Sequence, residues 1–275
     1  MIKLRFYNSI GEAMFDENGW HLTKAEGLSI PTKLLTAARY TNQPGQTTTS
    51  CIANPRTITL SGDVNLAVCG ADALSLGSII LDTDGILEVT TDRFSRMIKA
   101  RCTELVFGEK NGPFRVFVSQ FLCDCPYFED NDYTENVIYD RAPMLSKDTV
   151  LPAMFSKRVS KGSLYYSGSA YSEPIMYLNV PDGTGTLSIC NLTTGGKISL
   201  SYDGSQYCEL VIDAENRTIT DENGKLRLEI LTDDSFFDGF TLVRGDNMLE
   251  VLNSNVAVDV KARMRYKVRY TEAVV

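Results

Sequence analysis

The sequence predicts a mainly β protein built from antiparallel sheets, and two kinds of observation support this. Apolar and polar residues alternate with a period of two in many short segments, for example residues 2–6 and 225–230. This alternation puts one face of a strand on a core and the other in solvent, which is typical of antiparallel sheets. Asn-Gly pairs, which supply the positive-φ residues that tight hairpins prefer, occur at 18–19, 111–112 and 223–224.

Helical signals are few and short. Residues 71–81 can form one short helix, residues 148–155 one or two turns limited by Pro152, and residues 235–238 a single turn. The expected elements are therefore short strands joined by tight turns, arranged in sandwich-like or barrel-like units.

The chain length of 275 residues suggests two domains, at about 150 residues per domain. Residues 129–148 lose the alternation and gather Asp, Asn and Pro, as a connection does. We expect a first β domain at residues 1–142, a connecting arm at 143–165 and a second β domain at 166–275.

The composition narrows the class of function. Asp and Glu total 35 and Lys and Arg total 27, so the net charge is −8. This charge disfavours sequence-independent binding to nucleic acid, which requires a cationic surface. No apolar run reaches the roughly 18–20 residues of a membrane helix, and the start of the chain resembles a strand rather than a secretory signal. The seven cysteines, an odd number, suit reduced and mostly buried thiols in a cytosolic fold.

No pattern of catalytic or ligand-binding residues stands out. The single histidine, His21, removes most acid–base and metal chemistry at neutral pH. Phosphate-binding glycine loops and the G-x-S-x-G nucleophile turn are absent from the sequence. Cys123-Asp124-Cys125 lacks the spacing of a zinc site, and the acidic residues 129–132 suit a solvated loop better than a cation site. We therefore expect no enzyme activity, no catalytic residue, no metal site and no cofactor.

The strongest local pattern lies near the end of the sequence. Residues 260–270 alternate, and one face of the expected strand carries apolar and aromatic residues. The other face carries five cations: Lys261, Arg263, Arg265, Lys267 and Arg269. Two interpretations stay open, namely a solvated edge strand protected from aggregation by its charge, or a surface for an acidic partner such as a neighbouring copy of this acidic chain.

Several segments together form a more specific pattern. Residues 56–62 follow the order Arg-x-Ile-x-Leu-x-Gly, and the aromatic-rich residues 114–125 run into Pro126, Tyr127 and Phe128. The second half adds segments at 172–176, 189–195, 210–213, 236–242 and 244–247, and the cationic strand closes the series. The order and spacing of these segments resemble the distal tail protein (Dit) family of long-tailed bacteriophages and prophages, with Arg244 where that family usually has proline.

This resemblance implies a structural virion protein rather than an enzyme. It implies an N-terminal β-sandwich-like domain with a short helix and a protruding hairpin, which forms a ring of six copies, and a C-terminal galectin-like β-sandwich. Such a ring joins the tail tube to the baseplate or tail-fibre hub. The expected partners are therefore further copies of the chain, the tail tube protein, a hub or fibre protein and a receptor-binding protein. The expected location is the virion tail tip, after assembly in the bacterial host cytoplasm.

Within this expectation, Tyr127 and Phe128 close the core of the first domain and orient the acidic connection that follows. Two other classes of function stay open. One is a glycan-binding module, in which the second domain recognises host cell-wall saccharide, although this half of the sequence has neither Trp nor His. The other is a glycosidase or peptidase of the tail tip. Binding to host cell walls distinguishes the first from a pure connector, and hydrolysis of those walls is required for the second.

Overall fold

The structure is a computed structural model that describes residues 2–41, 44–69, 80, 84–139, 160–255, 258 and 260–273. It divides the chain into two compact units: unit 1 comprises residues 1–131 and 270–275, and unit 2 comprises residues 132–269. Within the described residues, no helix has the length and apolar character required to span a membrane.

This division differs from the sequence-based expectation in three places. Strand β11 (Thr134–Tyr139), expected in the first domain, belongs to unit 2. Strand β12 (Ser160–Tyr166) occupies the end of the expected arm, whose residues 143–159 lie outside the described part of the chain. The last six residues, expected in the second domain, return to unit 1. Alternation shows which face of a strand is buried, but it does not show which core covers that face.

Unit 1 is built on one antiparallel sheet in which neighbouring strands follow the order β2-β1-β7-β8-β9-β6-β3, with β10 paired to β8. Its strands are β1 (Lys3–Tyr7), β2 (Glu12–Met14), β3 (Trp20–Glu26), β6 (Arg56–Asn65), β7 (Gly85–Thr90), β8 (Ser95–Asn111), β9 (Phe114–Cys123) and β10 (Phe128–Asp130).

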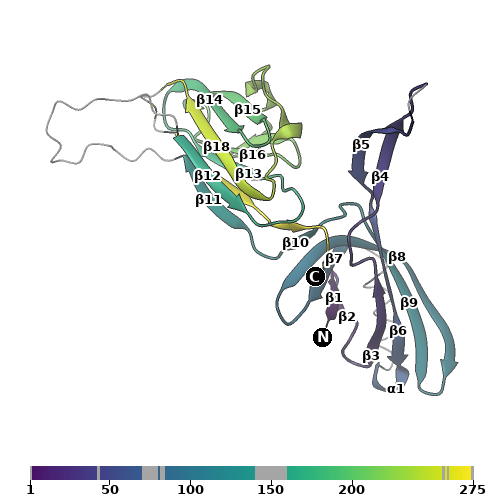
Figure 1. Ribbon diagram of the computed structural model, residues 1–275. Coiled ribbons are helices and arrows are strands. Elements are labelled where there is room, and N and C mark those ends of the chain that lie inside the picture. Colours follow the sequence, from purple (N-terminus) through teal and green to yellow (C-terminus); the bar gives the residue numbers. More distant parts are fainter. Residues whose placement is uncertain are drawn as a thin grey trace. The chain divides into compact units, whose positions relative to one another are not determined.

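The long strand β8 makes this sheet enclose its own core. Residues 95–100 of β8 pair with β7, and residues 101–111 pair with β9, with a register shift between Cys102 and Glu104. A bulge of this kind bends a strand and increases its twist. The two halves of the sheet meet through aromatic rings, since the centroids of Phe6 in β1 and Phe121 in β9 lie 5.2 Å apart. The curved path of β8 can be followed in Figure 1.

The alternation in β6 is the clearest agreement between sequence and structure in unit 1. Arg56, Ile58, Leu60 and Val64 point inward and are buried. Gly62 occupies the inward position where β6 crosses β3, and a Cβ atom there would lie 2.0 Å from the carbonyl oxygen of His21. Only glycine allows this close approach of two backbones.

A second, two-stranded sheet belongs to unit 1. Strands β4 (Lys33–Ala38) and β5 (Thr47–Ala53) pair only with each other within the described residues, and nearly all their side chains are exposed. Figure 1 shows this hairpin extending beyond the main sheet of its unit.

The described helical elements are short. Helix α1 spans Leu66–Cys69, and Ile80 is helical and fully buried, but the rest of the helix expected at 71–81 lies outside the described residues, as does the turn expected at 148–155. The single turn expected at 235–238 is present as the 3₁₀ element η2 (Phe237–Gly239), and a second one, η1, spans Leu228–Ile230.

Unit 2 contains two antiparallel sheets, with orders β11-β19-β13-β16-β17 and β12-β18-β14-β15. The ring centroids of Tyr166 in β12 and Tyr266 in β19 lie 5.8 Å apart, so the two sheets face each other across a common core. Besides β11 and β12, its strands are β13 (Ile175–Asn179), β14 (Thr184–Asn191), β15 (Gly196–Asp203), β16 (Glu209–Asp213), β17 (Thr218–Asp221), β18 (Gly245–Asn253) and β19 (Lys261–Tyr266), and β20 (Arg269–Tyr270) follows at the return to unit 1. The predicted mainly β class, with antiparallel sheets, is confirmed.

Candidate assembly surfaces

Most of the predicted cationic stripe lies on the outer face of the five-stranded sheet of unit 2. In β19, Lys261 and Arg263 are exposed and Arg265 is half-buried, while Ala262 and Met264 between them are buried in the core. The alternation read from the sequence therefore holds through β19.

The stripe already has partners within its own chain. A guanidinium nitrogen of Arg263 lies 3.1 Å from a carboxylate oxygen of Glu135 in the neighbouring strand β11. The guanidinium of Arg265 stacks 3.9 Å from the ring centroid of Tyr133, and the ammonium group of Lys267 lies 5.0 Å from the same ring. Exposed pairs of this type contribute only about 0–1 kcal/mol each, so they leave the stripe available for intermolecular contact.

Arg269 does not belong to the stripe, and the expectation for this residue is wrong. Its side chain is only 4% exposed and lies 3.2 Å from Glu173 and 2.7 Å from Glu215. Its backbone N–H donates to the hydroxyl oxygen of Tyr166 at 2.8 Å. The alternation ends here because Val268 and Arg269 are both buried. Burial raises the pKa of Glu173 despite the opposing effect of Arg269.

The Pro126-Tyr127-Phe128 motif lies at the core of unit 1, as predicted for Phe128. Phe128 is fully buried within the core cluster of unit 1, whereas Tyr127 is half-buried. The guanidinium carbon of Arg56 lies 4.7 Å from the Phe128 ring centroid, and Arg56 Nε donates to the carbonyl oxygen of Pro126 at 2.9 Å. The two sequence motifs of the first half, 56–62 and 126–128, therefore meet at one buried contact.

Arg56 also forms hydrogen bonds with backbone segments that are distant in sequence, including the one at Thr271. Its guanidinium donates to the carbonyl oxygens of Gly27 and Thr271, each at 2.6 Å. Burial lowers the pKa of Arg56, and the nearby Cys123 and Cys125 act in the opposite direction. A buried guanidinium that donates to several carbonyls fixes the relative positions of the segments that carry them.

A second arginine repeats this arrangement. Arg96 is buried, its guanidinium carbon lies 3.7 Å from the Tyr270 ring centroid, and it donates to the carbonyl oxygen of Glu272 at 2.6 Å. Ala273 is fully buried, and its N–H donates to the carbonyl oxygen of Leu28. Sequence reasoning missed this docking of residues 270–273, and no local pattern in the sequence indicates it.

The β4–β5 hairpin presents apolar side chains to solvent. Leu34, Leu35 and Ile52 are 57%, 56% and 62% exposed, and Leu34 lies directly opposite Ile52 in the pairing register. An isolated two-stranded hairpin is at best marginally stable in water, and exposed apolar side chains such as these are typical of an interaction surface. The residues alone gave no signal for this hairpin, because Thr47–Ala53 lacks a clear period of two.

A second apolar surface lies on the outer face of strands β8 and β9. Its exposed members are Phe114 at 42%, Val116 at 50%, Leu122 at 36% and Val106 at 46%. Val106 lies opposite Val118, which is half-buried and aligned with Phe114 and Val116 along β9, so these four side chains form one stripe, and Gln120 separates Leu122 from it. Unit 1 therefore carries two separate apolar surfaces, the hairpin and this β8–β9 stripe.

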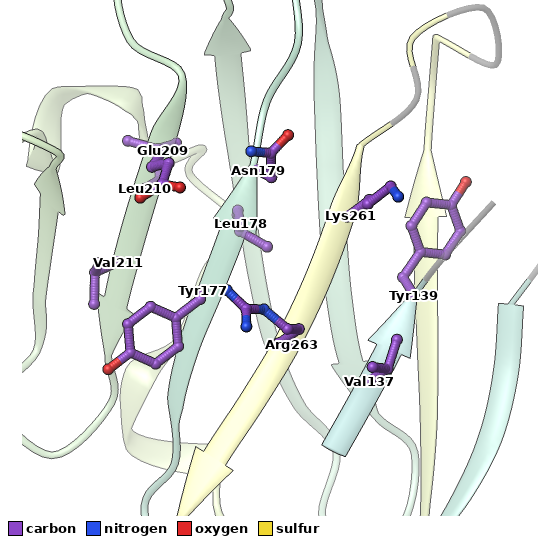
Figure 2. A pocket seen from close by; sticks show the side chains of 10 residues that line it. All are labelled: Val137, Tyr139, Tyr177, Leu178, Asn179, Glu209, Leu210, Val211, Lys261 and Arg263. Atoms are coloured by element: carbon purple, nitrogen blue, oxygen red, sulfur yellow. The ribbon is translucent and has the colours of Figure 1, made fainter. Parts of the chain in front are cut away.

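Unit 2 carries a groove of about 370 Å³ on the outer face of its five-stranded sheet. Figure 2 shows the lining side chains, which come from β11, β13, β16 and β19. Tyr177 of β13 is placed between Arg263 of β19 and Val211 of β16, its partners in the pairing register. The groove thus combines an aromatic ring with charged and polar side chains.

The described residues include acidic and thiol side chains that could in principle ligate a metal or act as nucleophiles. No group of three or more His, Cys, Asp or Glu side chains among them is placed to hold a metal ion. Burial raises the pKa of the Cys123 thiol to about 12 and also raises the pKa of Cys102, so both are poor nucleophiles. The expectation of mostly buried thiols fits Cys69, Cys102 and Cys123, whereas Cys51 and Cys208 are exposed.

Comparison with known proteins gives one family match and several structural matches. Residues 167–270 match the family of the siphovirus-type tail component, C-terminal domain. No curated protein matches the chain.

Among solved structures, the crystal structure of SPP1 Dit (gp 19.1), described as a paradigm of the hub adsorption apparatus in phages that infect Gram-positive bacteria, has a TM-score of 0.69 and 10% sequence identity. That match covers 98% of this chain and 99% of SPP1 Dit. Two structures of the phage p2 baseplate in its activated conformation, with Sr and with Ca, give TM-scores of 0.47 and 0.44 at 10% identity, and each covers 96% of this chain and 98% of the other.

The family match and the SPP1 Dit match agree with each other along the chain. The family match lies almost wholly within unit 2, and the structural match extends over both units. The resemblance to the distal tail protein family is therefore confirmed: residues 167–270 are similar to the C-terminal domain of siphovirus-type tail components, and the chain as a whole has a fold similar to that of SPP1 Dit.

Proposed function

We propose that this chain is a structural, non-enzymatic protein of a phage tail tip, which forms a ring of six copies and joins the tail tube to the baseplate or fibre hub. The observation that carries the proposal is the fold shared with SPP1 Dit over 98% of the chain, together with the tail-component match of residues 167–270. In this proposal unit 1 builds the ring, and unit 2, a galectin-like sandwich, presents surfaces to other tail proteins. Assembly takes place in the host cytoplasm.

The two apolar surfaces of unit 1 suit a closed ring. A ring requires a head-to-tail interface, in which two different surfaces of the same subunit meet. The β4–β5 hairpin and the β8–β9 stripe are two such surfaces, and neither is covered within its own chain in the described residues. We propose that the hairpin of one copy contacts unit 1 of the next copy, with the β8–β9 stripe as the receiving surface.

Sedimentation velocity of the purified chain, with a matched pair of variants, tests the ring. The wild type should sediment as an assembly of about 183 kDa, which is six times the chain mass of 30.5 kDa. Leu34→Ser/Ile52→Ser removes the apolar pair from one face of the hairpin and should shift the protein to the monomer. Leu226→Ser/Leu228→Ser changes two leucines of unit 2 with similar exposure and should leave the assembly intact.

A second variant tests the receiving surface separately. Val116→Lys places a charge in the centre of the β8–β9 stripe, where Val116 is 50% exposed, and should weaken the association by about tenfold or more. A strictly monomeric wild type at high concentration would contradict ring formation by the chain alone. Full assembly of both the hairpin variant and Val116→Lys would remove these two surfaces from the interface.

A further inference from the structure

We propose that the groove on the outer face of the five-stranded sheet in unit 2 binds a saccharide. This site goes beyond the structural role proposed above, and it depends only on side chains of unit 2. The argument rests on the arrangement of the lining residues and on the chemistry that they offer together.

The pairing register places the lining residues in two neighbouring rows across the sheet. In the first row, Tyr177 of β13 lies between Arg263 of β19 and Val211 of β16. In the second row, Asn179 lies between Lys261 and Glu209 on the same two strands. In Figure 2 the side chain of Arg263 extends from β19 toward β13, alongside Tyr177.

The first row supplies an apolar surface. Tyr177 is half-buried, so part of its ring reaches the groove, and Val211 continues the apolar surface toward β16. The C–H face of a pyranose ring packs against such an aromatic surface, while the hydroxyl end of tyrosine stays polar. The groove therefore has a stacking residue, although unit 2 contains neither Trp nor His.

The second row supplies hydrogen-bonding groups of both kinds. Lys261 offers donors, Glu209 offers acceptors, and the Asn179 amide offers both. A phosphate group or the side-chain carboxylates of an acidic peptide require donors, and the carboxylate of Glu209 would repel either one. A polyhydroxylated ligand uses donors and acceptors equally, because each hydroxyl group can donate and accept.

The size of the groove fits the same ligand class. Its volume of about 370 Å³ lies at the lower end of the roughly 300–1,000 Å³ found for small-molecule sites. Such a space holds one or two sugar residues and leaves the remainder of a longer chain in solvent. The combination of an aromatic ring, paired donors and acceptors and this size favours a saccharide over the other ligand classes.

Saturation-transfer NMR with the full chain tests the site. The probes are soluble oligosaccharides of hexoses, N-acetylhexosamines, deoxyhexoses and hexuronates, with a poly-glutamate peptide as an alternative. Inorganic phosphate, which has no carbon-bound protons, is tested as a competitor of the bound oligosaccharide. At least one oligosaccharide should receive saturation on its ring protons. Titration should then show that Tyr177→Ala weakens its binding by about tenfold or more.

Two further variants distinguish a loss of binding from a loss of folding. Asn179 and Glu209 are exposed, so Asn179→Ala and Glu209→Gln should keep the fold and still weaken the binding of the oligosaccharide. Tyr165→Ala is the matched control, because Tyr165 is a 67% exposed tyrosine of the other sheet, and it should bind like the wild type. Absence of binding by every oligosaccharide would overturn the proposal. Binding that survives Tyr177→Ala, or preferential binding of phosphate or poly-glutamate, would overturn it as well.

Discussion

The guanidinium of Arg56 stacks on Phe128 at 4.7 Å and joins three parts of the chain that are distant in sequence. It holds the turn at Gly27, the Pro126 carbonyl next to Phe128, and the Thr271 carbonyl near the end of the chain. Each acceptor is a backbone carbonyl, so this contact fixes the path of the backbone rather than neutralising a charge. The predictions for unit 1 follow from it.

Phe128→Ala should lower the free energy of unfolding of unit 1 by about 3–5 kcal/mol, because the ring is fully buried and the substitution leaves a cavity. Trp20 is the single tryptophan of the chain and lies in the same core, so its fluorescence in a denaturant titration reports on unit 1 alone. Ile10→Ala, at a side chain of unit 1 that is 54% exposed and lies outside both apolar surfaces, is the control and should change the midpoint little. An unchanged midpoint for Phe128→Ala would show that Phe128 is not part of the core.

Arg56→Lys should destabilise unit 1 by about 3 kcal/mol or more, because a lysine cannot reach several carbonyls with one planar group and leaves acceptors unsatisfied. Arg101→Lys, at an exposed pair with Asp84, is the control and should leave the unfolding midpoint close to that of the wild type.

Deletion of residues 270–275 should destabilise unit 1 in a similar way, because it removes the Thr271 and Glu272 carbonyls and the buried Ala273. The Trp20 signal measures these variants too. A truncated chain with a wild-type Trp20 transition would contradict the docking of this segment.

Thiol reactivity should follow burial. In the native protein Cys51 and Cys208 should react quickly with a thiol reagent near pH 8, and Cys102 and Cys123 should react only after unfolding. Burial raises the pKa of Cys123 from its ordinary value of 9.0 to about 12, so the unfolded chain ionises this thiol first as the pH rises. Its contribution to stability is therefore complete below pH 9 and is lost between pH 9 and 12. Rapid native modification of Cys123, located by mass spectrometry, would contradict this.

The charge reversal Arg263→Glu/Arg265→Glu distinguishes the two interpretations of the cationic stripe. If the stripe faces an acidic surface of another copy, the variant should associate more weakly than the wild type, and added salt should reduce the difference. The effect should be modest, because exposed ion pairs contribute only about 0–1 kcal/mol each. Association that is indifferent to both salt and the reversal would leave the stripe as a solvated face. Sedimentation across salt concentrations measures both effects.

The sequence predicts the local features of this fold well and its long-range contacts poorly. Alternation identifies the buried faces of β6 and β19, because side-chain direction in a strand has a period of two. It does not reveal that Arg269 turns inward, because the two carboxylates that hold it, Glu173 and Glu215, come from distant segments. The docking of residues 270–273 on Arg56 and Arg96 is missed for the same reason.

The candidate surfaces also include features that the sequence reveals and features that only the long-range arrangement of strands creates. The cations of β19 are visible in the sequence because they recur at every second residue. The groove beside them is not visible, because it is created by the register of β13, β16 and β19, which places Tyr177 next to Arg263 and Asn179 between Lys261 and Glu209. The apolar surface of the hairpin is also hidden, since Leu34 and Ile52 resemble core residues until the structure shows them exposed.

Electron microscopy of the purified wild-type chain tests the central claim most directly. Class averages of negatively stained particles should show closed rings with sixfold rotational symmetry, since a head-to-tail interface closes only at a rotation that divides the circle. Particles that remain single subunits at high protein concentration, or that form twofold dimers, would contradict the claim that this chain builds a ring.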